Sequence, residues 1–493
     1  MVLDESHFAR SGIRGVTSEL GLREVARIQS DPHFRDARLW VKMFRHNRAR
    51  KLEGGASMPF SDHSLIDKPI PDSSHIAILL RSLKGGGMET SMMRLAGGLA
   101  ARGLKVDVVV ADKLKGPGLE RAPQNVRLIS LARSRVPWWT LWRALRPVEG
   151  GATAANRPAP LPIVPPRGVC FLPPLIRYLD RERPDALIAG GTIYNLIALW
   201  ARRLTGLSMR VVISERNSLS AEISSPVNRG QWHLRHAPQL VASTYPSADA
   251  IVANSNGVAA DLANCTGLRR DAITTIYNPV VDSVLTEKAL TPVAHPWFAP
   301  DMPPVVLGVG RLHPQKDFPT LLRAFARVRA WRDARLVILG ADAKHGVRAE
   351  LMSLAASLGV TDDVDMPGFA ANPFAFMARA GVFVLSSRNE GCPNVLIEAM
   401  ACGCPVVSTR CPHGPDEILD DGRYGRLVDV GDDDALAQAI AATLDQRPDR
   451  DCLRARAAEF GIDRAVDQYL ACLERVAGPT GVTVTEPIPP SPT

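Results

Sequence analysis

Short runs of Val, Ile, Leu and Ala recur along the chain, and each is followed by a polar loop and then a helix-forming stretch. Strands of a parallel sheet have this pattern, because helices cover both faces of the sheet. The expected strands are residues 75–83, 106–110, 186–189, 211–214, 250–253, 305–309, 336–339, 382–386 and 406–408. The alternation predicts an α/β fold built from βα units.

The chain is long enough for two such sheets. It has 493 residues with 46% apolar content, whereas a single hydrophobic core rarely serves more than about 300 residues. A proline-rich stretch at 281–304 interrupts the alternation and has the composition of a linker. We therefore expect two Rossmann-like domains that face a cleft, at 75–280 and 305–455.

The remaining segments lie outside this alternation. We interpret residues 1–74 as an accessory extension, partly disordered, and residues 133–170 as an insertion rich in Pro, Gly and Trp. A closing helix is expected at 456–478 and a disordered tail at 479–493, which is rich in Pro and Thr.

The chain is basic, with a formal net charge of +8 and a pI of about 9.2. Its partners should be anionic, although charge alone does not distinguish nucleotide phosphates, acidic glycans, anionic lipid and nucleic acid. Basic and aromatic residues occur together near Trp40 and Trp138. They fit either peripheral contact with an anionic membrane or ordinary solvation and packing.

Neither secretion nor a membrane span is expected. Asp4 and Glu5 stand where a signal peptide would be positively charged, and the longest uncharged stretch, 186–201, is too short to cross a bilayer. The eight cysteines are scattered without the spacing of a zinc site. These features predict a cytoplasmic protein with reduced, buried thiols.

The most informative segment is 386–403, which reads as a strand end, a loop, a helix and a stop. Pro393 fits the first turn of the helix, where its missing N–H is not needed, and Gly403 fits the helix end. The backbone amides of Asn394, Val395 and Leu396 should then lack helical partners and bind an anion.

Two carboxylates accompany this expected anion site. Glu390 lies in the loop, and Glu398 lies on the helix, whose side chains lean back toward its N-terminus. They can flank one ligand, with phosphate at the helix terminus and sugar or ribose hydroxyls on the carboxylates. Alternatively, Glu390 caps the helix and Glu398 forms a surface ion pair. Apolar neighbours of Glu398 favour a ligand, because an unpaired buried carboxylate is costly.

Two further segments supply groups for a phosphate. After the first strand of the second domain, Arg311 can fork onto phosphate oxygens and Lys316 adds a mobile charge, together neutralising a diphosphate without metal. A basic loop before a helix is the alternative. In the first domain, Gly86 and Gly87 follow the first strand, where they either approach a phosphate or form a tight turn.

Together these segments resemble the large group 1, or family 4, of glycosyltransferases, which have the two-domain GT-B fold. The resemblance covers about residues 75–478. It rests on Glu390 and Glu398 within Glu-Gly-Cys-Pro-Asn and Glu-Ala-Met-Ala, and on Gly-Arg-Leu and Gln-Lys-Asp at 310–317. Gly-Pro-Asp-Glu-Ile at 414–418, Gly-Arg-Tyr-Gly at 422–425 and the Gly-Gly loop complete it.

The resemblance implies a retaining transfer of a sugar from a nucleotide diphosphate donor, bound by the second domain, to an acceptor bound by the first. Arg311 and Lys316 would hold the diphosphate, Glu390 would position the donor sugar, and Glu398 would bind the ribose. The leaving phosphate would help to deprotonate the acceptor. Further donor contacts are implied for Gly86, Gly87, Gly391, Cys392, Pro393, Asn394, Val395 and Leu396.

Acceptor recognition has weaker signals. Many family members have a histidine near the reacting sugar, where this chain has Gly-Gly-Thr-Ile-Tyr-Asn at 190–195. Glu215 and Arg216 follow a strand, and their position alone suggests contact with the acceptor or donor. The acidic run 432–434 is better explained as a helix start than as a metal site. No cofactor or metal is expected.

A UDP-sugar is the expected donor, with GDP-mannose as the second choice. The expected acceptor is a glycan or lipid-linked glycan at the inner face of the cytoplasmic membrane, in polysaccharide or glycolipid biosynthesis, and no nucleic acid is expected. One alternative is a nucleotide-sugar epimerase of the same fold. Another is a non-catalytic membrane- or glycan-binding protein with a degenerate transferase fold. A dehydrogenase is disfavoured because Gly308 and Gly310 lack a third glycine in register.

Overall fold

The computed structural model describes residues 74–114, 119, 122–133, 167–224, 236–342 and 346–474. The expected N-terminal extension, most of the insertion, the C-terminal tail and the basic aromatic segments near Trp40 and Trp138 lie outside these residues. Both sheets described below belong to one compact unit.

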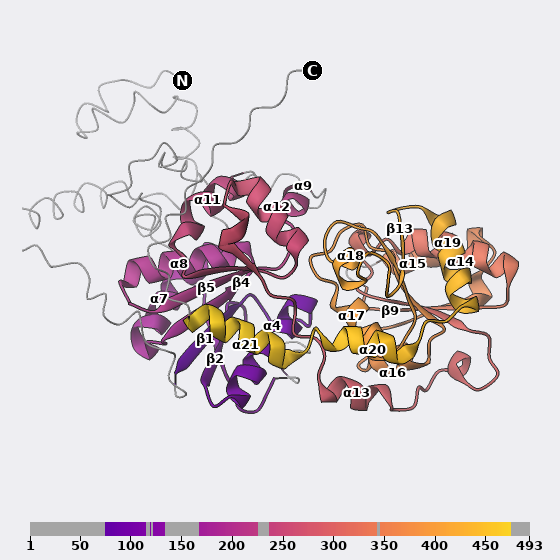
Figure 1. Ribbon diagram of the computed structural model, residues 1–493, viewed down its shortest axis with the longest axis horizontal. Coiled ribbons are helices and arrows are strands. Elements are labelled where there is room, and N and C mark those ends of the chain that lie inside the picture. The colour runs from indigo at the N-terminus through magenta and orange to yellow at the C-terminus, as the bar shows by residue number, and fades with distance from the viewer. Residues whose placement is uncertain are drawn as a thin grey trace, which may run out of the picture. The chain divides into compact units, whose positions relative to one another are not determined.

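The first domain contains a seven-stranded parallel sheet with the order β3-β2-β1-β4-β5-β6-β7 (Figure 1). Its strands are β1 (His75–Leu80), β2 (Lys105–Val110), β3 (Arg127–Ser130), β4 (Ala186–Gly190), β5 (Arg210–Glu215), β6 (Ala250–Ala253) and β7 (Ile273–Thr275). One face packs against α7 (Leu172–Glu182), α8 (Thr192–Thr205), α9 (Leu219–Ser224), α11 (Ala237–Thr244) and α12 (Asn256–Thr266). The other face packs against α4 (Gly87–Ala101) and α21 (Ile462–Glu474).

The second domain contains a six-stranded parallel sheet with the order β10-β9-β8-β11-β12-β13. Its strands are β8 (Val305–Val309), β9 (Arg335–Leu339), β10 (Val364–Gly368), β11 (Val382–Leu385), β12 (Val406–Thr409) and β13 (Arg426–Val428). One face packs against α13 (Ser283–Ala289), α16 (Pro373–Arg379), α17 (Asn394–Ala401), α18 (Pro415–Ile418) and α20 (Arg450–Ala458). The other face packs against α14 (Phe318–Trp331), α15 (Val347–Ser357) and α19 (Asp433–Asp445).

The two sheets share one topology, which confirms the expected pair of Rossmann-like domains. In each, the strand order reverses next to the first strand, between β1 and β4 and between β8 and β11. Ligands of such sheets bind outside the carboxyl ends of the strands at this reversal. The carboxyl edges of the two sheets are therefore where a site is sought.

All nine expected strands are present, and the described residues contain four further strands that were not predicted. The additional strands are β3, β7, β10 and β13, which are the outermost strands of the two sheets. An edge strand is covered on fewer sides, so it needs fewer apolar residues and lacks the apolar run that marks an inner strand.

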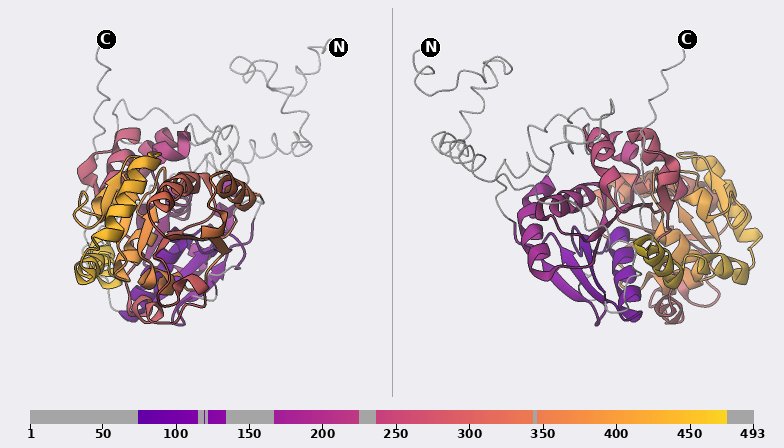
Figure 2. Two further views of the ribbon diagram at one scale, coloured as in Figure 1. Left: turned by 90° about the vertical axis from the view of Figure 1, so that its right-hand side faces the viewer. Right: turned by 60° about the vertical axis from the view of Figure 1, so that its left-hand side comes forward.

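The C-terminal part differs from the single closing helix expected at 456–478. Two helices are present, with a break at Phe460 and Gly461. The first, α20, packs against α17 of the second domain, whereas α21 packs against α4 of the first domain (Figures 1 and 2). Val466 and Tyr469 of α21 are fully buried in the first-domain core. Among the helices that the structure describes, none is long and apolar enough to cross a bilayer.

Candidate active site

The loops after β8 and β11 are held together by hydrogen bonds. The amide of Arg388 donates to the carbonyl of Gln315 at 2.8 Å, and Gln315 Nε2 donates to the carbonyl of Asn389 at 2.8 Å. Ser386 Oγ donates to the carbonyl of Lys316 at 2.7 Å. The two loops that carry the predicted catalytic residues therefore form one unit at the carboxyl edge of the sheet.

Lys316 and Glu390 are in direct contact within this unit. Lys316 Nζ lies 2.6 Å from Glu390 Oε1, and Ser387 Oγ donates to the same oxygen at 2.7 Å. A side chain at Gly310 would come within 3.1 Å of Lys316 Cε, so this glycine leaves room for the lysine. Among the described residues, the Glu390 carboxylate bonds to Lys316 and Ser387 and to no amide at the start of α17. The pairing places an ammonium group and a carboxylate together at the carboxyl edge of the sheet. It rejects the alternative in which Glu390 caps α17.

Arg311 differs from Lys316 in having no partner among the described residues. Its side chain is exposed, and within the described part of the chain its guanidinium makes neither an ion pair nor a hydrogen bond. Its full charge is therefore available to an anion that binds at the loop after β8.

The start of α17 agrees only partly with the sequence analysis. The helix begins at Asn394 with Pro393 as its N-cap, and Gly403 has a φ of 70° just after its end, as expected. However, the amide of Leu396 donates to the carbonyl of Pro393 at 3.0 Å. The prediction of a free amide at Leu396 is therefore wrong, and the expected anion site has one donor fewer.

The segment before α17 is buried against the first domain. A side chain at Gly391 would come within 2.4 Å of the carbonyl oxygen of Arg216, so only glycine fits this approach. The carbonyl of Cys392 accepts a hydrogen bond from Asn278 Nδ2 at 3.2 Å. Burial raises the pKa of the Cys392 thiol to about 12, which keeps it protonated. The backbone here is thus set by close contact between the domains.

The side chain of Asn394 connects α17 to the glycine loop. Its Nδ2 donates to the carbonyl of Gly87 at 3.1 Å and to Ser91 Oγ at 2.9 Å, and its Oδ1 accepts from Asn278 at 2.6 Å. A Cβ at Gly86 would meet Glu89 Oε2 at 2.2 Å. The sequence analysis assigned Asn394 a backbone contact and missed this side-chain role.

Glu398 is 8% exposed, which agrees with the burial expected from its apolar neighbours. It is paired, however, because Arg94 Nη1 of α4 lies 3.4 Å from Glu398 Oε1. Arg94 Nε also lies 3.8 Å from Asp282. The sequence contained no signal for Arg94, whose pairing with Glu398 depends on how the two domains meet.

Glu215 occupies the end of β5 but is 2% exposed. Its carboxylate accepts hydrogen bonds from the Tyr245 hydroxyl, from Thr192 Oγ1 at 2.9 Å and from Asn195 Nδ2 at 3.1 Å. Burial raises the pKa of Glu215 to about 7. These bonds argue against the direct acceptor contact suggested for Glu215. The buried carboxylate instead fixes the first turn of α8 through Thr192 and Asn195.

Arg216, the other residue suggested for acceptor contact, is 4% exposed. Its carbonyl accepts from Asn254 Nδ2 at 3.1 Å and faces Gly391 across the domain contact. Arg216 therefore lies against the loop of the second domain that contains Gly391, rather than on an open surface.

The acidic run at 432–434 starts a helix, as the sequence analysis favoured. Asp432 accepts a hydrogen bond from the amide of Ala435 at 2.8 Å as the N-cap of α19. Asp433 and Asp434 pair with Arg327 at 2.8 and 3.5 Å. Within the described ranges, no group of three or more His, Cys, Asp or Glu side chains is placed to hold a metal ion.

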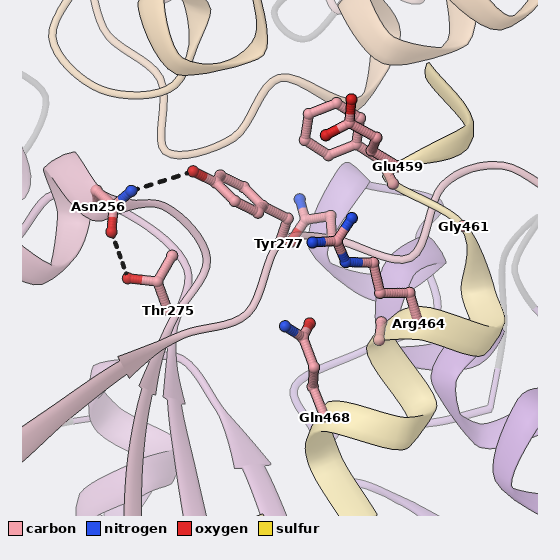
Figure 3. Close-up of a pocket in the computed structure, with 10 residues that line it drawn as sticks. Asn256, Thr275, Tyr277, Glu459, Gly461, Arg464 and Gln468 are labelled. Atoms are coloured by element: carbon pink, nitrogen blue, oxygen red, sulfur yellow. Dashed lines mark hydrogen bonds between the residues drawn. The ribbon is translucent and has the colours of Figure 1, made fainter. Parts of the chain in front are cut away.

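A pocket of about 250 Å³ lies where the chain passes between the domains (Figure 3). Asn256 contributes to one wall, where it bonds to the Tyr277 hydroxyl at 3.2 Å and to Thr275 at 2.8 Å. Arg464 and Gln468 of α21 lie across from them (Figure 3). None of the predicted site residues lines this pocket, but Asn278, which bonds to Cys392 and Asn394, does.

Comparison with known proteins adds to this geometry. The model of glycosyltransferase family 4 matches residues 85–284, and the model of glycosyl transferases group 1 matches residues 303–446. The chain belongs to the group 1 glycosyltransferases. The second match contains both carboxylates and both cations singled out in the sequence.

Two characterised relatives are similar in part. One is the N-acetylgalactosamine-N,N'-diacetylbacillosaminyl-diphospho-undecaprenol 4-alpha-N-acetylgalactosaminyltransferase of Campylobacter jejuni, which is 34% identical over 51% of this chain and 64% of its own length. Another is the lipopolysaccharide core biosynthesis glycosyltransferase LpsE of Rhizobium meliloti, 33% identical over 46% of this chain and 62% of its own. The chain thus spans slightly less than two thirds of each relative.

Solved structures share the fold over most of the chain. Anabaena Alr3699/HepE in complex with UDP and glucose aligns with a TM-score of 0.63 at 21% identity, covering 81% of this chain and 99% of that one. Sucrose-phosphate synthase from Thermosynechococcus elongatus aligns with a TM-score of 0.58 at 20% identity, covering 81% and 96%. The two Rossmann-like domains of this glycosyltransferase form the GT-B fold.

Proposed function

We propose that this glycosyltransferase moves a sugar from a nucleotide diphosphate donor to a glycan or lipid-linked acceptor, with retention of the anomeric configuration. The observation that carries the proposal is the contact of Lys316 with Glu390 at 2.6 Å. The same loop after β8 carries Arg311, which is exposed and has no partner among the described residues. One carboxylate and two cations at the carboxyl edge match a sugar bound to a diphosphate.

The roles follow from the charges that change during the reaction. As the bond between the anomeric carbon and the phosphate oxygen breaks, negative charge grows on the phosphate, and Arg311 and Lys316 stabilise it without metal. Glu390 accepts hydrogen bonds from the sugar and stabilises the positive charge that develops on the ring. The acceptor hydroxyl attacks from the side of the leaving phosphate, which takes the hydroxyl proton.

Contacts between the domains would complete the donor site. Glu398, held at the domain contact by Arg94, would accept hydrogen bonds from the ribose hydroxyls. The loop from Gly391 to Val395 would hold the sugar and phosphate. Asn394, through its bond to Gly87, would keep Gly86 and Gly87 against the donor.

A UDP-sugar is the donor that we propose first, and GDP-mannose is the second. The UDP and glucose named with the Anabaena structure support the first choice. A GDP-mannose-dependent mannosyltransferase of Mycolicibacterium smegmatis, 36% identical over 29% of this chain, supports the second. The diphospho-undecaprenol in the name of the Campylobacter relative supports a lipid-linked acceptor.

We also propose a cytoplasmic location with peripheral contact to an anionic membrane, which the net charge of +8 favours.

Thermal unfolding with UDP, GDP, ADP and the corresponding nucleotide-sugars tests the donor site. UDP should raise the melting temperature of the wild type, because a ligand at about 100 times its Kd adds about 2.7 kcal/mol of stability. The rise should disappear in Arg311→Ala and persist in Arg323→Ala, which removes an exposed arginine of α14 without a partner in the described residues. A wild type that no nucleotide stabilises would contradict the proposal. Acceptor-dependent formation of a glycoside would separate transfer from epimerisation.

A further inference from the structure

Cations gather at the carboxyl edge of the first sheet, where β1, β2 and β3 end. Residues 81–84, 111–114 and 131–133 include Arg81, Lys84, Lys113 and Arg133 but only one acid, Asp112. All four basic side chains are exposed. Because these strands are neighbours in the sheet, their ends lie about 5 Å apart from one strand to the next.

Three of these cations continue one face of the sheet. Leu79, Ala111 and Leu131 belong to the core on the face covered by α7 and α8. Side chains alternate along a strand, so Arg81, Lys113 and Arg133, each two residues further on, extend the same face beyond the core. The guanidinium of Arg133 indeed lies over the ring of Phe171 on that face, 5.7 Å from its centroid.

Tyr194, in the first turn of α8, belongs to the same neighbourhood. Burial raises the pKa of Tyr194 to about 12, while the charges of Arg81 and Arg133 act in the opposite direction and that of Asp112 reinforces it. Its hydroxyl is therefore protonated, and it lies within electrostatic range of Arg81, Arg133 and Asp112.

Most of these groups have no partner among the residues that the structure describes. Arg133 Nη2 lies 3.3 Å from Asp112 Oδ1. By contrast, Arg81, Lys113 and the Tyr194 hydroxyl make no ion pair or hydrogen bond within the residues that the structure describes. Donors without a neutralising partner among the described residues thus lie at two neighbouring strand ends and at the start of one helix, on the same edge of the sheet.

We propose that Arg81, Arg133 and Tyr194 form a subsite for a diphosphate group of the acceptor. Two guanidinium forks match the oxygens of two linked phosphates, and the tyrosine hydroxyl adds a third donor. A group with several charges can compete with Asp112 for Arg133, whereas a single carboxylate is poorly matched to four cations.

The subsite would serve the same reaction as the candidate active site. Gly87, which contacts Asn394 of the donor loop, follows β1 at the same edge as Arg81. An acceptor could therefore hold its diphosphate on the first domain while its sugar end faces the donor. This inference rests on the proposed transfer of sugar to an acceptor and names the chemistry of that acceptor.

Calorimetric titration of the full chain with inorganic pyrophosphate tests the subsite. Saturating UDP is present throughout, so that the cations of the donor site are occupied. Wild type should bind pyrophosphate, and Arg81→Ala and Arg133→Ala should each weaken binding about tenfold, as expected for loss of one charge-assisted contact. Lys105→Ala, which removes an exposed lysine at the amino end of β2, should bind like the wild type. Equal affinity in all four proteins would overturn the proposal.

Further measurements distinguish a diphosphate from a single phosphate and from the headgroups of a lipid surface. Inorganic phosphate should bind at least about tenfold more weakly than pyrophosphate, because it engages one guanidinium fork instead of two. Tyr194→Phe should weaken pyrophosphate binding by a smaller factor. Binding to phosphatidylglycerol vesicles that depends on Arg81 and Arg133, without binding of pyrophosphate, would instead assign these residues to the membrane surface and overturn the diphosphate subsite.

The UDP titration keeps the two proposals apart. UDP affinity should be unchanged in Arg81→Ala and Arg133→Ala and reduced in Arg311→Ala. Failure of the wild type to bind UDP would contradict the proposed function itself. Normal UDP binding with pyrophosphate binding that ignores Arg81 and Arg133 would contradict only the subsite.

Discussion

The carboxyl edges of the two sheets carry charge in different ways. At the second-domain edge, Lys316 pairs with Glu390 and Arg388 pairs with Asp317. At the first-domain edge, the acid Glu215 is buried among neutral hydrogen-bond donors, while cations such as Arg81 stand exposed. At the second edge the residues that we propose to be catalytic are therefore held by internal pairing, whereas the first edge offers charge that an incoming ligand can neutralise.

The largest effect is expected from breaking the pair at the second-domain edge. Lys316→Ala removes a cation from the leaving diphosphate and leaves Glu390 with Ser387 alone, so kcat should fall about 100- to 1000-fold. The rate of acceptor-dependent sugar transfer from the donor that the thermal experiment selects would measure it.

The exposed Lys288 of α13 provides a matched control, since Lys288→Ala removes the same charge away from the edge. If the kcat of Lys316→Ala is within about threefold of the wild-type value, the Lys316–Glu390 pair only supports the loop. The second-domain edge would then not differ from the first in catalytic role.

A smaller effect, on stability, should come from the buried acid at the first-domain edge. The pKa of Glu215 is raised by burial to about 7 from a usual 4.5. The folded protein therefore holds this proton more tightly than the unfolded chain, and the free energy of unfolding should fall as pH rises from about 4.5 to 7, by roughly 3 kcal/mol. Glu215→Gln should flatten this part of the pH profile, which urea unfolding between pH 5 and 8 would measure.

Glu350→Gln, at an exposed position on α15, should keep the wild-type profile. If Glu215→Gln has the same slope as the wild type, the carboxylate is charged throughout this range, and the two edges differ less than the burial of Glu215 indicates.

The smallest effect is expected at the acidic run that follows β13. Asp432→Ala removes the N-cap of α19 and should lower the free energy of unfolding by about 1 kcal/mol. Urea unfolding with and without Mg²⁺ would measure it. Stabilisation of the wild type by Mg²⁺ that Asp432→Ala abolishes would reinstate the metal site that the sequence analysis rejected.

The sequence predicted the inner part of each domain better than its periphery. Inner strands such as β8 and β11 need apolar side chains on both faces, so they are visible as apolar runs. Because these two strands are neighbours, the residues that follow them meet, and the contact of Lys316 with Glu390 agrees with the predicted shared ligand. Edge strands such as β3 lack this constraint and were missed.

Contacts between the domains were beyond the sequence analysis. Arg94 meets Glu398, and Asn394 meets Gly87, only because both sheets approach in one particular way. The spacing and periodicity of residues in the sequence do not determine how the two domains pack against each other. The surroundings of Glu215 were missed for a related reason, since Tyr245 reaches it from a separate short helix 30 residues later.

The return of α21 to the first domain bears on how the protein folds during synthesis. Ribosomes make the seven strands of the first sheet early, but Val466 and Tyr469, which fill one face of its core, emerge only after the entire second domain. Until then that face lacks α21 and exposes apolar surface, and such surface attracts chaperones and invites aggregation. The first domain to be translated is thus the last to be completed, so its maturation is coupled to that of its neighbour.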